Sequence, residues 1–188
     1  LRCLVGSEMC IRDRAYTFLR FPTSTRANAL GGHTVALVER DPSLIFHNPA
    51  LLGAEMDGMI NLNYMNYISD INVGSALFTK AHGEKGAWGV GATFISYGDI
   101  KEVLPDNVVT GASLSAKDIS VNGFYSRDLN ERWRGGLSLK FLYSGLADYT
   151  SIGLCVDAGL SYYNSDKGFS FGSVSYTHLR AHETSQDL

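Results

Sequence analysis

The chain has 188 residues, enough for one ordinary domain, with 16 Lys and Arg against 19 Asp and Glu and a net charge of -3. Hydrophobic residues make up 45% and charged residues 19%, a balance that excludes an intrinsically disordered chain and a collagen-like one. The sequence has no basic run that could neutralise a phosphate backbone, which argues against nucleic acid as a partner. It also lacks the ~18 consecutive apolar residues of a membrane-spanning helix, so any role in a membrane must use strands.

Both ends of the chain differ from its middle. Residues 1–14 and 174–188 show no sustained period of 2 or 3.6, and their runs LVGSEMCIRDR and SYTHLRAHET are similar to translated sequencing-adapter DNA. We therefore exclude both ends from the fold argument and expect them to make few contacts with the rest. The predicted domain is residues 15–173. We expect it to be a fragment of a longer protein, because it stops inside a strand that begins at Phe169.

The first part of this domain is predicted to be mostly irregular. Leu30, Gly31 and Gly32 precede an apolar run at 35–38, which predicts a short strand. Residues 41–52, DPSLIFHNPALL, contain two Pro and do not alternate. They predict a turn with a short helix that opens near Pro49.

From residue 59 onward the pattern becomes strand, turn, strand. Turn signals rich in Gly, Asn, Asp and Ser separate most of the apolar runs. The sequence therefore predicts an all-β antiparallel meander of hairpins, preceded by a short N-terminal loop and helix segment. The predicted strands are 59–67, 72–80, 87–97, 118–128, 134–146, 151–163 and 169 onward.

Several strands alternate cleanly between apolar and small or polar residues. Even positions from 152 to 162 are apolar, whereas odd positions are small or polar and include Cys155 and Asp157. The strand at 134–146 repeats the pattern, with Lys140 on the polar side and Leu142 as an exception. We expect the apolar sets to lie on one outward face of a curved sheet. The set comprises Leu137, Leu139, Phe141, Ile152, Leu154 and Val156.

Two architectures produce this alternation. A soluble sandwich buries the apolar face in a shared core, whereas an outer-membrane barrel turns it toward lipid. Strands of ten or more residues and polar faces rich in Gly and Ser favour the barrel. Aromatic residues near strand ends also favour it, since they would form an interfacial girdle. These are Tyr64, Tyr67, Tyr97, Tyr143, Tyr162 and Tyr163.

A resemblance supports the barrel. The leader 18–32 (FLRFPTSTRANALGG), then Asp41 and the run 48–52 (NPALL), resemble the opening of the PorV/PorQ group, relatives of the FadL-type outer-membrane barrels. Later segments, 88–91 (WGVG), 96–98 (SYG), 136–140 (GLSLK) and 149–151 (YTS), are more similar to PorQ-like proteins. The motif residues, which we take as structural, are Leu30, Gly31, Gly32, Asn48, Pro49 and Ala50.

The resemblance implies a non-enzymatic outer-membrane barrel of the type IX secretion and cell-surface attachment machinery of Bacteroidota. Expected partners are outer-membrane lipid and PorZ-, PorU- and PorV-like proteins, with a PorZ-like surface component anchored by the barrel. The alternative is a FadL-like outer-membrane transporter of hydrophobic small molecules. A soluble β-sandwich binding module is a third possibility, and the family barrel is longer than residues 15–173.

The sequence offers little for catalysis, cofactors or metals. Asp157 and Cys155 share a face, but we expect no His on a neighbouring strand, and there is no nucleophile elbow. His47 has no second ligand at metal-binding spacing. Asn48 is predicted to cap a short helix whose first residue is Pro49. Asp157 and Lys140 are expected to pair with other interior polar groups.

Overall fold

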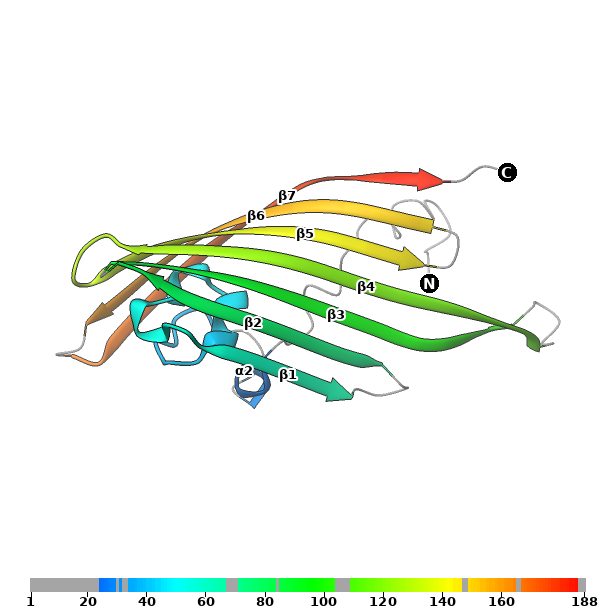
Figure 1. The fold of residues 1–188 in the computed structure, drawn as a ribbon, viewed down its shortest axis with the longest axis horizontal. Coiled ribbons are helices and arrows are strands. Elements are labelled where there is room, and N and C mark those ends of the chain that lie inside the picture. Colours follow the sequence, from blue (N-terminus) through cyan, green and yellow to red (C-terminus); the bar gives the residue numbers. More distant parts are fainter. Residues whose placement is uncertain are drawn as a thin grey trace, which may run out of the picture.

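The computed structural model describes residues 24–29, 31, 34–66, 71–83, 85–103, 109–146, 149–164 and 167–185. A segment of short helices comes first, and seven strands follow it (Figure 1). The helices are α2 (Thr25–Ala29) and the single 3-10 turns η2 (Pro42–Phe46), η3 (Pro49–Leu51) and η4 (Ala54–Met56). The strands are β1 (Ile60–Asn66), β2 (Asn72–His82), β3 (Gly86–Val103), β4 (Val109–Asp128), β5 (Trp133–Leu146), β6 (Tyr149–Asn164) and β7 (Phe169–Ser185).

The strands form one antiparallel sheet in which each strand pairs with its neighbours in sequence, from β1 to β7. This confirms the predicted all-β meander. The sheet twists and curves, and the helical segment lies against one of its faces (Figure 1). Within the described residues β1 and β7 each pair on one side only, so the sheet is open. No second sheet covers this one in the part of the chain that the structure describes, so the arrangement is that of part of a barrel and not of a sandwich.

The β3–β4 hairpin is longer than the alternation predicts. We expected strands at 87–97 and 118–128, but β3 continues to Val103 and β4 begins at Val109. The register shifts between Ser96 and Asp99, where Gly98 has a φ of 69°. This bulge interrupts the two-residue period without ending the pairing, so the period alone misses the outer half of the hairpin.

Two further expectations are wrong. Residues 35–38 form a bend followed by irregular backbone and not a strand, and the carbonyl of Val35 accepts a hydrogen bond from the Asn48 side chain, 2.7 Å away, instead of from a strand partner. Residues 174–185 do not stand apart from the sheet, since β7 pairs with β6 as far as Ser185 opposite Tyr149. Any strand edge with free backbone groups can template such pairing. Residues 1–14 and 186–188 lie outside the described residues.

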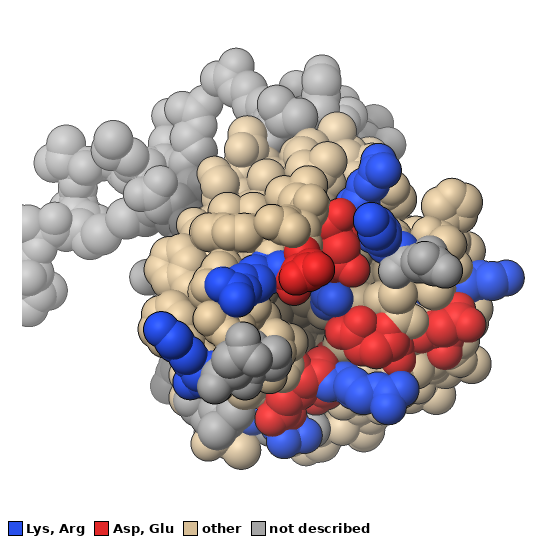
Figure 2. All heavy atoms as spheres, turned by 90° about the vertical axis from the view of Figure 1, so that its left-hand side faces the viewer, with Lys and Arg blue, Asp and Glu red and all other residues tan. Residues whose placement is uncertain are grey.

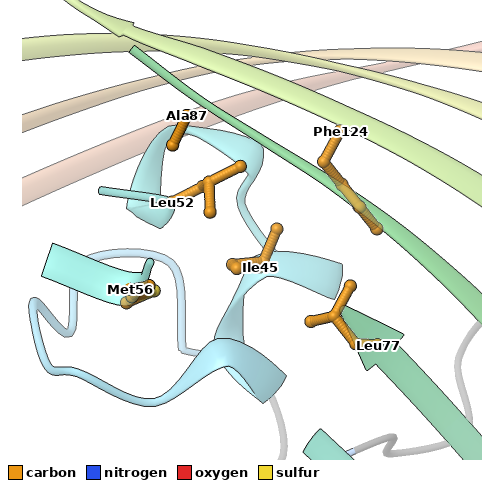
Figure 3. Packing of buried hydrophobic residues seen from close by; sticks show 6 residues of the cluster. All are labelled: Ile45, Leu52, Met56, Leu77, Ala87 and Phe124. Atoms are coloured by element: carbon orange, nitrogen blue, oxygen red, sulfur yellow. The ribbon is translucent and has the colours of Figure 1, made fainter. Parts of the chain in front are cut away.

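The largest apolar core lies between the helical segment and the concave face of the sheet. Figure 3 shows side chains of the helical segment facing side chains of β2, β3 and β4. The cluster comprises Ile45, Leu52, Met56, Leu77, Ala87 and Phe124. Phe46 adds an edge-to-face contact with Phe124, with ring centroids 5.4 Å apart. Burial of these side chains fixes the helical segment inside the curve of the sheet.

Candidate functional site

The distribution of polar and apolar side chains over the two faces of the sheet is the reverse of that in a soluble protein, with apolar side chains exposed and polar side chains buried. On its convex face large apolar side chains are open, for example Leu137 at 55% and Leu139 at 52% exposure. On its concave face polar side chains are buried, including Lys140 at 8% and Asp157 at 1%. The predicted outward set is confirmed: Leu137, Leu139, Phe141, Ile152 and Leu154 are exposed, and Val156 is half-buried.

The apolar part of the outer face is bordered by charged side chains, so its extent along the strands can be estimated. On β4 it is bounded by two exposed cations, Lys117 and Arg127, which enclose Ile119, Val121 and Tyr125. These bounds are ten positions apart, so at ~3.3 Å per residue they span roughly 33 Å along the strand. A strand tilt of about 40° reduces this to about 25 Å, the height of the apolar band of outer-membrane barrels.

Aromatic residues gather on the outer face at the end where β2–β3, β4–β5 and β6–β7 turn, which we call the short-turn end. Trp133 contacts Tyr162 at 4.9 Å between ring centroids, and Phe78 contacts Trp88 at 6.1 Å. Three members of the predicted girdle do not lie on the described outer face. Tyr163 shares the concave side of β6 with Ser161, and both line a hollow beside Arg134. Tyr97 points inward, because its hydroxyl donates to Asp118 Oδ2 at 2.7 Å. Tyr67 lies outside the described residues.

The concave face carries a buried ion pair. Lys140 Nζ lies 2.7 Å from Asp157 Oδ2, which also accepts a hydrogen bond from the Ser138 hydroxyl at 3.0 Å. The Cys155 thiol donates to the other carboxylate oxygen at 3.3 Å. The two predicted interior charges therefore satisfy one another, which a buried charge requires. The expectation that no His lies on a neighbouring strand is wrong, because β7 places His178 opposite Cys155 in register.

The Asn-Pro-Ala motif builds the turn at the centre of the helical segment. The Oδ1 of Asn48 accepts a hydrogen bond from the backbone N–H of Ala50 at 3.0 Å, and Pro49 opens η3, which confirms the predicted cap. The side chain is fully buried. Because its amide also donates to the Val35 carbonyl, Asn48 joins two turns of the helical segment with one side chain.

Two glycines of the sheet make room for this motif. A Cβ at Gly136 on β5 would overlap the backbone of Pro49 and Ala50, and one at Gly159 on β6 would overlap the Asn48 side chain. The motif therefore packs directly on the strand backbones, which any side chain at these two positions would prevent. Of the remaining motif residues, Gly31 has a φ of 101°, a conformation that favours glycine. Leu30 and Gly32 lie outside the described residues.

Polar contacts tie the helical segment to the short-turn end. The Thr79 and Ser126 hydroxyls each donate to a backbone carbonyl of the segment, those of Met56 and Leu52, at 2.6 Å. Arg134 bridges Asp128 and Glu55, at 2.5 and 3.1 Å. Sequence reasoning missed these contacts, because the paired residues lie too far apart in the chain for spacing to reveal them.

A hollow of about 510 Å³ opens beside Arg134 at this end, lined by Leu51, Leu129, Trp133 and charged residues. Figure 2 looks at this end of the molecule and shows acidic and basic side chains next to each other around the hollow. Because positive and negative side chains are mixed here, their electrostatic potentials partly cancel and the hollow does not attract an ionic substrate of either sign.

The described residues hold no group of three His, Cys, Asp or Glu placed to bind a metal ion. None of their helices has the length and apolar character needed to cross a membrane. No protein-family model matches the chain, and a search of curated proteins found no match either. The features that bear on function are therefore the two faces of the sheet and the helical segment that packs on the concave one.

Proposed function

We propose that this chain forms part of an outer-membrane β-barrel whose convex face contacts lipid. The observation that carries the proposal is the inverted polarity of the sheet: Lys140 and Asp157 are buried, whereas Leu137, Leu139 and Phe141 are open. In water this arrangement would leave a wide apolar surface unburied, but in a bilayer it places each group in a favourable medium. The apolar height of about 25 Å supports the same assignment.

Within the outer membrane, we propose a non-enzymatic component of the type IX secretion and attachment machinery that anchors a surface partner. This proposal rests on the resemblance of the Leu-Gly-Gly and Asn-Pro-Ala segments and on the later segments similar to PorQ-like proteins. Two structural features support anchoring over transport. The concave wall is mainly polar, and the helical segment packs against β2, β4, β5 and β6 on that side.

A FadL-like transporter of hydrophobic small molecules is the second candidate. It is favoured by the helical segment, which occupies the concave side where a gating segment would lie, and by an apolar patch on the inner wall. That patch comprises Val73, Ile95, Leu142 and Cys155. Met65, Ile71 and Tyr97 pack against this patch. The other buried side chains of the inner wall are mainly polar, which makes transport the weaker proposal.

Lipid contact can be tested with the two tryptophans of the chain, Trp88 and Trp133, which both lie open on the convex face. The full chain is reconstituted in vesicles of phosphatidylcholine with brominated acyl chains, which quench tryptophan on contact. We expect strong quenching by bromolipid and weak quenching by aqueous iodide. Strong iodide quenching with no effect of bromolipid would overturn the lipid-facing assignment in favour of a soluble sandwich.

Anchoring and transport can be separated in cells that carry the gene for this chain. We expect deletion of the gene to release a surface protein into the medium and to leave the uptake of long-chain fatty acids unchanged. Loss of uptake with surface proteins retained would refute anchoring and support the transporter.

A further inference from the structure

We propose that Arg127 and Lys80, on the outer face at the short-turn end, bind the phosphate of an anionic phospholipid headgroup. The inference rests on the proposed contact of this face with a bilayer and adds a defined lipid position to it. Both cations lie at the border of the apolar band, where headgroups begin. Long basic side chains at such a border extend toward the phosphates while their stems stay on apolar surface.

Arg127 is exposed on the outer face of β4. Its partners in register on β3 and β5 are Gly86 and Gly135, so no side chain lies directly opposite it on either strand. Trp88 and Trp133 lie at the diagonal positions, one on each side. The Leu129 side chain and the Tyr125 hydroxyl approach these two glycines, so Arg127 has an apolar neighbour on one side and a phenol on the other. The planar donors of its guanidinium can meet two oxygens of one phosphate.

Lys80 adds a second cation to the same place. It is exposed and lies directly opposite Trp88, on the side away from Arg127. Tyr125, opposite Trp88 on β4, turns its hydroxyl to within 3.8 Å of where a Cβ of Gly86 would stand. Two cations and a phenol hydroxyl thus surround Trp88, and indole rings prefer the interfacial depth of a bilayer.

Neither Lys80 nor Arg127 takes part in an ion pair among the described residues. An acidic side chain close to Lys80 is that of Asp57, whose carboxylate accepts a hydrogen bond from the backbone N–H of Ala81 at 2.9 Å. Asp128, next to Arg127 in sequence, turns to the other face and pairs with Arg134. The charged side chains described on the outer face of the sheet are all cations, namely Lys80, Lys117 and Arg127. The whole chain carries a net charge of -3, so this face is selectively positive and complementary to an anionic lipid surface.

The test measures which lipid gathers beside Trp88 and Trp133. The full chain is reconstituted in mixed phosphatidylglycerol and phosphatidylcholine vesicles, with bromine on the acyl chains of one lipid and then of the other. The ratio of quenching gives the enrichment of phosphatidylglycerol at this surface. We expect roughly fivefold enrichment for each cation, falling toward one in the double variant Arg127→Gln, Lys80→Gln.

Lys117→Gln is the matched control, because it removes a cation from the same face at the opposite border. It should leave the enrichment unchanged, whereas raised salt should lower the enrichment in the wild type. Enrichment that survives the double variant, or that Lys117→Gln abolishes equally, would overturn the lipid position. Equal quenching by the two lipids would also overturn it and leave lipid contact intact, whereas no quenching by either would reject the proposed function itself.

Discussion

Replacing Gly136 by Ala should dislodge the Asn-Pro-Ala turn from the sheet. The added Cβ would meet the carbonyl carbon and oxygen of Pro49 and the nitrogen of Ala50, which are backbone atoms that no rotamer change can move. The turn must therefore shift as a unit, and overpacking of this kind costs about 1–3 kcal/mol. The free energy of unfolding can be measured for the full chain in lipid vesicles by urea titration, with tryptophan emission as the signal.

Gly123→Ala on β4 supplies the matched control. Gly123 faces outward with nothing within 4 Å of an added Cβ, so the same substitution there only restricts the unfolded chain. It should stabilise the strand by about 0.5–1 kcal/mol. We therefore expect the two alanine variants to differ by about 1.5–4 kcal/mol. Equal stabilities would refute the direct packing of the motif on β5.

Three further substitutions test other parts of the molecule. Asn48→Ala removes the cap of η3 and the contact with residue 35, and should lower the midpoint of urea unfolding by an amount equivalent to about 1–2 kcal/mol. Lys140→Met leaves Asp157 charged and unpaired, and should destabilise by about 3–5 kcal/mol in the same assay, whereas adding Asp157→Leu should restore most of that loss. Leu154→Arg should destabilise the inserted barrel by about 2–4 kcal/mol and so lower the yield of its heat-modifiable folded form, whereas Leu154→Phe should be tolerated. Equal loss of folded form in both variants would contradict a lipid-facing Leu154.

The strands could be predicted because one face of each is less exposed than the other, so a two-residue period runs along most of their length. The period fails where the chain departs from ideal pairing, as at the bulge near Gly98. It also fails at residues 35–38, whose apolar character is satisfied by packing of Leu37 and Val38 against the helical segment instead of by a sheet partner. Composition alone cannot distinguish these two ways of burying an apolar run.

The candidate site was less accessible to sequence reasoning than the fold. The cap at Asn48 is a local interaction across two residues, so the motif itself predicts it. The contact between Arg134 and Glu55 spans 79 positions, and that between Ser126 and Leu52 spans 74. Nothing in the spacing of these residues specifies that they meet, because the meeting depends on how the completed sheet curves.

The separation of these contacts has a consequence for the order of assembly. Each strand pairs with the next strand in the sequence through a hairpin, so the meander can form by the addition of one strand at a time. The helical segment precedes β1 in the chain, yet η3 packs on β4, β5 and β6. The segment synthesised before the sheet is thus one of the last to dock. It can dock only after β4, β5 and β6 have paired and curved, so its docking is a marker of a correctly formed sheet.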